Sequence, residues 1–471
     1  MRREHGWTAR ATCALLVAIA GSGCGGGDEA NPLFVPAFLA SDVRVDTDAP
    51  GAARSEGIRV AVDGLNVYCV WTDARNGETD IYFNRSADGG ATWQLSDMRL
   101  DTDLRGAAAS ADPQIARSGR TLFVVWEDSR GGGRDIYLQR SDDAGATWLV
   151  ADVRLDSDAP GEALSEDAVL GVDGSAVHVA WEEERDGQRD VYYRGSSDGG
   201  VSFRPEVVLN TAPGASYSDR PRMAVSGPRV YVAWKDNRDG AYDIHLNASA
   251  DGGLTWLAPD VRVETGVAGA TDSNDPEIDA DGDSVYVVWS ESRSGNSDIR
   301  LNRSSDRGQS WLIADMRIDT DPAGAGTSIR PKVRCAGGTV YVVWVDGRDG
   351  NLDVRFNRST DAGQSWLAAD LRLDTDAPGA NTSEFVQIHA SGPNVYVAWQ
   401  DDRDSANDIR FSYSADQGAT FLAQDLRCDT HPAGLADSML PRVASDGTNV
   451  YVLWADQRDG QADVYCRPSI R

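Results

Sequence analysis

A tryptophan-centred repeat runs through the chain and constrains its fold more than any other feature. The sequence around each tryptophan recurs, as "VYCVWTDARNGETDIYFNRS" at 67–86 and "VYVVWVDGRDGNLDVRFNRS" at 340–359 show. Repeats of this length indicate supersecondary units that bury their apolar faces against their neighbours. The tryptophans follow one another at intervals of 55 residues, with one interval of 53: Trp71, Trp126, Trp181, Trp234, Trp289, Trp344, Trp399 and Trp454.

Each repeat is predicted to contain four short β-strands separated by Gly- and Asp-rich turns. In the first repeat we expect strands at about 58–62, 67–71, 80–85 and 92–100, where apolar and β-branched residues concentrate. No segment carries a sustained helical period. Eight four-stranded antiparallel sheets of this size are typical of an all-β, eight-bladed β-propeller.

The two ends of the sequence predict that the ring closes. An aromatic residue opens the expected fourth strand of seven repeats, and the eighth would fall beyond Arg471. Phe38 lies one repeat before Trp93, and "AFLASDVRVDTD" at 37–48 parallels "TWLVADVRLDSD" at 147–158. We therefore expect an N-terminal strand to pair with the last blade, within a single propeller domain at 36–471, so that no sheet edge is left open.

The N-terminal segment differs from the repeats. Arginines precede an apolar run at 14–20, which is typical of a secretion signal and too short to span a bilayer as a mature helix. Cys24 ends the sequence "GSGC", which resembles the lipobox of bacterial lipoproteins, with Gly where Leu is usual. We expect a signal peptide at 1–24, lipidation at Cys24 and a flexible tether at 25–35, with plain secretion as the alternative. The chain would then be extracytoplasmic, on the outer membrane or cell surface.

The composition of the chain limits the classes of partner that it can bind. The formal net charge of -29 opposes binding to nucleic acid through its phosphates. We expect membrane contact only through the lipid anchor, and a monomer. The other cysteines of the mature chain have no metal-ligand spacing and fall in different repeats, so neither a zinc site nor a disulfide framework is indicated: Cys69, Cys335, Cys428 and Cys466.

A second motif recurs in seven repeats between the third and fourth expected strands. Its first copy is "SADGGATW" at 86–93, and the pattern S-x-D-x-G-x-[TS]-[WF] resembles the Asp box, or bacterial neuraminidase repeat, of sialidase-like propellers. A catalytic acid has no need of seven copies. We expect these aspartates to accept backbone N–H bonds within the turn, and Gly90 and its equivalents to adopt a left-handed conformation. The aspartates are Asp88, Asp143, Asp198, Asp251, Asp306, Asp361 and Asp416.

Two other charged motifs recur. Arg75 and its equivalents follow an acid by two residues and precede Asp80 or its equivalent by five, which predicts an Asp–Arg–Asp network. Links between repeats carry D-x-D pairs such as Asp46 and Asp48. These oxygens have the spacing to bind calcium, but we expect them to cap turns, and we expect no cofactor and no metal.

Ligand binding is expected where the repeat is broken, because one small ligand cannot contact eight blades alike. The most variable position lies near the start of each innermost strand, and it should face the channel mouth. Four of its residues are cationic and would form a basic arc for an anionic group such as a sugar carboxylate: Arg59, Arg222, Lys332 and Arg442.

The family resemblance implies more about this position. Sialidases hold their substrate carboxylate with three arginines, and "IRVA" at 58–61 is similar to the first of their motifs, with Ala61 in place of Pro. The resemblance implies Arg59, Arg222 and Arg442 as such a clamp.

The family's Tyr–Glu nucleophile pair is less well matched. Tyr217 is the one tyrosine in the links, and Glu384 and Glu166 are candidate acids, but no spacing brings them together. We therefore interpret the chain as a secreted or surface-anchored, non-catalytic module that binds a glycan or an extracellular protein. An exo-acting glycoside hydrolase of the exo-α-sialidase type and an architectural envelope protein are the alternatives.

Overall fold

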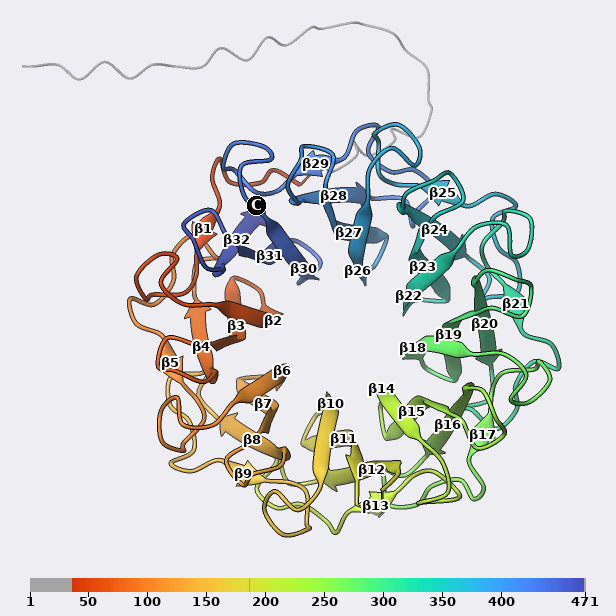
Figure 1. Ribbon diagram of the computed structural model, residues 1–471, viewed down its shortest axis with the longest axis horizontal. Coiled ribbons are helices and arrows are strands. Elements are labelled where there is room, and N and C mark those ends of the chain that lie inside the picture. The colour runs from red at the N-terminus through yellow and green to blue at the C-terminus, as the bar shows by residue number, and fades with distance from the viewer. Residues whose placement is uncertain (1–35, 186, 470–471) are drawn as a thin grey trace, which may run out of the picture. The chain divides into compact units, whose positions relative to one another are not determined.

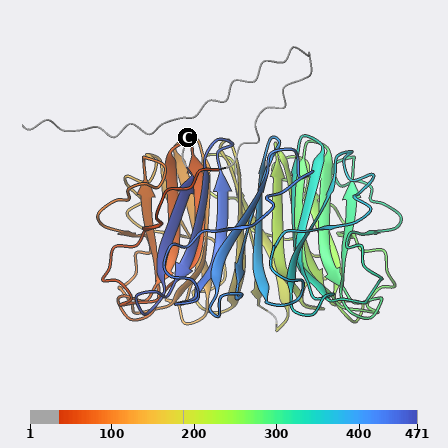
Figure 2. The same cartoon turned by 90° about the horizontal axis from the view of Figure 1, so that it is seen from above.

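The protein is described by a computed structural model, which covers residues 36–185 and 187–469. Eight four-stranded antiparallel sheets are arranged radially around a central axis (Figures 1 and 2). We call the region between the eight innermost strands the channel. The predicted eight-bladed β-propeller is therefore confirmed. The predicted signal peptide at 1–24, the predicted tether at 25–35 and the predicted lipidation site Cys24 lie outside the described residues. In the described part of the chain, no helix has the length and apolar character needed to cross a membrane.

Within a blade, the chain runs from the channel outward. The innermost strands of blades 1 to 8 are β2 (Ser55–Asp63), β6 (Ser110–Ser118), β10 (Leu164–Asp173), β14 (Ser218–Ser226), β18 (Ser273–Asp281), β22 (Ser328–Ala336), β26 (Ser383–Ser391) and β30 (Ser438–Ser445). The second strands are β3 (Asn66–Asp73), β7 (Thr121–Asp128), β11 (Ala176–Glu184), β15 (Arg229–Asp236), β19 (Ser284–Glu291), β23 (Thr339–Asp346), β27 (Asn394–Asp401) and β31 (Val450–Asp456).

The outer half of each blade is shorter. The third strands are β4 (Asp80–Ser86), β8 (Asp135–Ser141), β12 (Arg189–Ser196), β16 (Asp243–Ser249), β20 (Asp298–Ser304), β24 (Asp353–Ser359), β28 (Asp408–Ser414) and β32 (Asp463–Ser469). The fourth strands are β5 (Met98–Arg99), β9 (Val153–Arg154), β13 (Val207–Val208), β17 (Val261–Arg262), β21 (Met316–Arg317), β25 (Leu371–Arg372), β29 (Leu426–Arg427) and, for blade 8, β1 (Val43–Arg44).

The fourth strand is shorter than the prediction of 92–100, because a side chain replaces most of its ladder. The Asn84 amide donates to the carbonyl oxygen of Gln94 at 3.1 Å, and its oxygen accepts from the Gln94 N–H at 3.0 Å. Only Met98 and Arg99 then pair with β4. The aromatic residue before this segment packs between blades, as Trp148 does edge-on against Phe83 of the preceding blade at 5.0 Å between ring centroids.

The ring closes through the N-terminal strand, as predicted. β1 pairs with β32 in the order β1-β32-β31-β30, with Val43 opposite Cys466. Phe38 also bridges to Ser469 and packs edge-on against Phe411 of blade 7, at 5.1 Å between ring centroids. The last blade therefore combines strands from both ends of the described chain.

Each repeated tryptophan is buried, and in six blades its indole N–H donates to the carboxylate two residues later, which belongs to a polar network. In blade 1, Trp71 donates to Asp73 at 3.2 Å, and Ser55 donates to the same carboxylate at 2.9 Å. Arg75 binds Asp73 at 2.6 Å and Asp97 at 2.7 Å. The prediction that Asp80 is the second partner of Arg75 is therefore wrong.

The fourth strand explains that difference. Arg99 lies opposite Tyr82 of β4 and reaches Asp80 at 2.9 Å. The same guanidinium pairs with Asp101 at 2.7 Å and with Asp103. The D-x-D carboxylates of this link therefore hold an arginine.

The Asp-box turn is a closed set of local hydrogen bonds. Asp88 accepts from the N–H of Thr92 at 2.9 Å and from its hydroxyl at 2.6 Å. Ser86 donates to Asp88 at 2.7 Å and accepts from the Gly90 N–H at 2.8 Å. Gly90 has φ +80°, and a Cβ there would lie 3.4 Å from Cys466 Sγ of blade 8, so this turn approaches its neighbouring blade closely.

Candidate functional site

The two faces of the ring carry different loops. On one face, the Asp-box turn meets the turn between the first two strands, where Gly89 donates to Leu65 at 2.8 Å. On the other, the loop between the second and third strands meets the link to the next blade, where Glu78 donates to Gly106 at 3.2 Å. We call this second face the link face. It carries the features that differ most between blades.

Two channel arginines of neighbouring blades lie beside each other without an acid. Arg59 Nη1 and Arg442 Nε donate to the same carbonyl oxygen, that of Ile58, at 3.0 and 3.1 Å. Arg59 Nε also donates to the amide oxygen of Gln114 at 3.2 Å. Among the described residues, neither guanidinium forms an ion pair with a carboxylate. Desolvation and the charge of Arg59 lower the pKa of Arg442 well below its usual value.

The other two predicted cations share one acid. Arg222 lies 3.2 Å from Glu277, and Lys332 contacts the same oxygen. Although desolvation opposes it, the charges of Lys332 and Arg222 lower the pKa of Glu277 to about 2. The predicted basic arc is thus divided into a pair of arginines without an ion-pair partner and a group in which one acid neutralises one of two cations. The sequence contains the signal for this pairing, since Glu277 occupies the same strand position in blade 5.

A β-bulge shapes the mouth of the channel in every blade. The register of each innermost strand shifts two residues before the channel position, as it does between Glu56 and Arg59. The residue at the shift has positive φ, a conformation that is strained for side chains other than glycine and that concentrates at functional sites. The eight residues, with φ between 45° and 62°, are Gly57, Asp112, Asp167, Arg220, Asp275, Arg330, Phe385 and Leu440.

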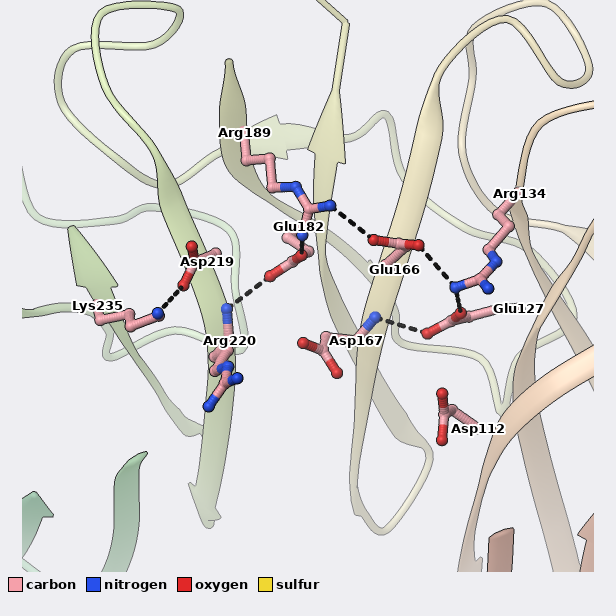
Figure 3. A pocket seen from close by; sticks show the side chains of 10 residues that line it. All are labelled: Asp112, Glu127, Arg134, Glu166, Asp167, Glu182, Arg189, Asp219, Arg220 and Lys235. Atoms are coloured by element: carbon pink, nitrogen blue, oxygen red, sulfur yellow. Dashed lines mark hydrogen bonds and ion pairs between the residues drawn. The ribbon is translucent and has the colours of Figure 1, made fainter. Parts of the chain in front are cut away.

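A charged pocket opens on the link face over blades 2 to 4 (Figure 3). Its volume is about 280 Å³, and its side chains come from the inner strands, the second strands and the loops beside them. Blades 2 to 4 carry charged residues at most of the strand positions that line this pocket, whereas the other blades have uncharged residues at several of the equivalent positions. Its lining is Asp112, Glu127, Arg134, Glu166, Asp167, Glu182, Arg189, Asp219, Arg220 and Lys235.

Buried glutamates connect one blade of the pocket to the next. Glu127 of β7 accepts from the backbone N–H of Asp167 at 2.7 Å, and Glu182 of β11 accepts from that of Arg220 at 2.6 Å. Each glutamate therefore supports the bulge of the following blade. Desolvation, with the nearby charge of Asp112, raises the pKa of Glu127 to about 8, and desolvation raises that of Glu182 to about 7.

Two arginines hold the third glutamate of the pocket. Glu166 pairs with Arg134 at 2.6 Å and with Arg189 at 2.9 Å (Figure 3). By contrast, the carboxylates of Asp112 and Asp167 accept no hydrogen bond and form no ion pair within the described ranges. These two acids stand at bulges, and they are the pocket oxygens most available to a ligand.

The residues considered for catalysis lie in different places. Glu166 lines the pocket, whereas Glu384 of blade 7 pairs with Arg330 at 3.2 Å. Tyr217 is 36% exposed in the link before β14. Its phenol makes no hydrogen bond to either glutamate in the described part of the chain. Sequence reasoning missed Asp112 and Asp167, because regular alternation does not reveal a bulge.

Comparisons with known proteins support the fold alone. No family model matches the sequence, and no curated protein matches it. Among solved structures, a puromycin-hydrolyzing peptidase of Mycobacterium tuberculosis matches with a TM-score of 0.50 and 15% identity, over 90% of this chain and 62% of that one. The polysaccharide lyase Uly1 matches with a TM-score of 0.50 and 9% identity, over 76% of this chain and 89% of that one.

A sialidase of Trypanosoma rangeli is also similar, with a TM-score of 0.36 and 11% identity, over 64% of this chain and 54% of that one. This likeness is too distant to carry an argument. The chain is a β-propeller protein, and its activity has to be argued from its own residues.

Proposed function

We propose that the chain is an extracytoplasmic, lipid-anchored propeller that binds an acidic glycan on its link face without cleaving it. The observation that carries this proposal is the position of the free acids Asp112 and Asp167. Each stands two residues before a channel position, and their charges act on Arg59 and Arg222 respectively. Acceptors for hydroxyl groups thus lie beside donors for a carboxylate.

The two acids and the two arginines of this site each suit a different part of an acidic glycan. Carboxylates accept hydrogen bonds from sugar hydroxyls, and the charged acceptors make these bonds stronger than neutral ones. Arg59 and Arg442 are close together and form no ion pair with an acid of the described ranges, so a sugar carboxylate would offset their mutual repulsion. Arginine suits this role because its fork-shaped guanidinium binds a carboxylate at two points.

Binding without cleavage is supported by how the other acids are used. Glycoside hydrolysis commonly needs one carboxyl group that is free to donate a proton to the leaving group, in addition to an ionised one. Here Glu166 is held by two arginines, Asp219 lies 3.3 Å from Lys235, and Glu127 and Glu182 each accept a backbone N–H. An extracellular protein that presents carboxylate and hydroxyl groups on its surface would bind to the same residues.

One observation favours an exo-acting glycosidase as the second candidate. Desolvation raises the pKa of Glu127 to about 8, although Arg134 pairs with this carboxyl group at 3.1 Å, and a raised pKa is the property required of a general acid. Asp112 or Asp167 would then be its partner. A purely architectural protein would use neither group.

Binding to a glycan array, together with a fluorogenic sialoside assay, separates the three functions. We expect the full chain to bind sugars that carry a carboxylate, and Asp167→Asn and Arg442→Ala to lose that binding. Asp63→Asn, on the opposite face, is the control and should bind as the parent does. Unchanged binding in both test variants would contradict the proposal, and sugar release that Glu127→Gln abolishes would establish the glycosidase instead.

A further inference from the structure

One position of the third strand is paired with a residue of the preceding loop in four of the eight blades. In blade 1, Asn76 donates to the hydroxyl of Tyr82 at 2.6 Å. In blade 8, Tyr465 donates to Asp459 at 3.0 Å. In blades 6 and 7, arginine at this position pairs with the loop aspartate. The residues at the position are Tyr82, Tyr137, Tyr192, His245, Arg300, Arg355, Arg410 and Tyr465.

Blade 4 differs because this residue is His245, a buried imidazole with nothing to bind. Its relative exposure is 4%, and neither Nδ1 nor Nε2 has a hydrogen-bond partner in the described chain. A carboxylate oxygen of Asp260 lies 3.8 Å from Nδ1, which is beyond hydrogen-bond distance. Desolvation and the charge of Arg238 lower the pKa of His245.

Two carboxylates converge on this imidazole. One oxygen of Asp239, one oxygen of Asp243 and one nitrogen of His245 all lie within 4.8 Å of one another. Asp243 is held in place by Arg262 at 3.0 Å and by the Gly269 N–H at 3.0 Å. Asp239 is exposed, so solvent reaches the cluster from the loop side.

We propose that Asp239, Asp243 and His245 bind a divalent transition-metal ion, such as Zn²⁺, at the rim of blade 4. One imidazole nitrogen with two carboxylate oxygens suits zinc, manganese or iron better than calcium or magnesium, which prefer oxygen alone. Three protein ligands leave a coordination position for water. Arg262 and the Gly269 N–H would orient the Asp243 carboxylate from the outside.

The surrounding charges fit a divalent ion. Four carboxylates and two guanidinium groups surround the imidazole, so two negative charges are uncompensated. A bound dication would neutralise them and give His245 the partner that it lacks. The groups are Asp236, Asp239, Asp243, Asp260, Arg238 and Arg262.

A second histidine cluster provides the contrast. Asp408, Asp429 and His431 also lie within 4.8 Å of one another. There, Arg427 pairs with both aspartates, and His431 Nε2 lies 3.2 Å from the carbonyl oxygen of Ala436. Nδ1 of His431 has no hydrogen-bond partner in the described chain, but all three residues of this cluster are buried, whereas Asp239 opens the first cluster to solvent. The second cluster therefore serves as the control for access.

Calorimetric titration of the metal-stripped, untagged full chain with ZnCl₂ tests the proposal. We expect one Zn²⁺ per chain, and loss of affinity of at least about tenfold in His245→Tyr, which installs the residue that four other blades carry. This variant should melt no lower than the metal-free parent. Asp239→Asn, at an exposed loop position, should lose affinity likewise, while His431→Asp should bind as the parent does.

Cobalt supplies a readout of the ligands themselves. Co²⁺ in place of Zn²⁺ should give visible absorption bands in the parent that are absent in His245→Tyr. The proposal is refuted if the parent binds no ion, or if both His245→Tyr and Asp239→Asn bind Zn²⁺ as tightly as the parent.

Discussion

Removing the N-terminal strand should unfold the whole propeller rather than loosen one blade. β1 and the residue after it supply several contacts to β32 that nothing else replaces. Val45 is fully buried, and its N–H donates to Val464 at 2.8 Å. Arg44 lies 2.9 Å from the buried carboxylate of Asp463. Deletion of residues 31–48 removes all of these contacts and exposes the edge of β32.

The expected loss is comparable with the stability of a domain. Full burial of a valine side chain contributes about 1.5–3 kcal/mol. Each lost backbone hydrogen bond costs about 0.5–1.5 kcal/mol. Leaving a buried carboxylate without its guanidinium costs about 3–5 kcal/mol. Native domains are stable by only about 5–15 kcal/mol in total, so little stability would be left.

Thermal unfolding and size-exclusion chromatography measure the effect. We expect the deletion variant to be unfolded or aggregated through its free edge, and a synthetic peptide of residues 36–48 to restore the folded monomer. Deletion of residues 31–35 alone is the control and should leave the melting temperature unchanged. A chain without residues 31–48 that melts with the parent and stays monomeric would refute the role of β1 in closure.

Other substitutions test the charged networks and the N-terminal segment. Arg75→Ala leaves two buried aspartates without a guanidinium, so urea unfolding should show a loss of about 3–5 kcal/mol. Arg54→Ala, at an arginine that is 64% exposed, should cost less than about 1 kcal/mol. Because folding raises the pKa of Glu127 from 4.5 to about 8, the stability from this group is lost as pH rises through that range. Glu127→Gln should flatten that part of the melting profile, and an unchanged slope would contradict the assignment. Cys24→Ser should move the chain from the membrane to the soluble fraction of a Gram-negative host, and equal partitioning would contradict lipidation.

The blade number and the closure could be predicted because both depend on periodicity alone. Eight tryptophans at one spacing define eight units, and Phe38 marks the strand that blade 8 lacks. The partners of individual charges could not be predicted in this way. Asp80 follows Arg75 by five residues, and this spacing predicts that the two pair. In the structure, Asp80 instead pairs with Arg99 of the fourth strand. Which of two arginines reaches a carboxylate depends on strand pairing, which spacing does not specify.

The candidate site shows why a repeat protein hides its own ligand position. Eightfold similarity gives each blade the same backbone, so a ligand can be recognised only by side chains at positions that vary. Sequence comparison between blades finds such a position at Arg59 and its equivalents, because side chains alternate regularly along this part of the strand and this one faces the channel. It misses Asp112 and Asp167, because the bulge shifts the alternation by one residue just before that position. These two acids combine strained backbone, free carboxylates and proximity to the channel cations, and they define the part of the surface where substitution should change binding without changing the fold.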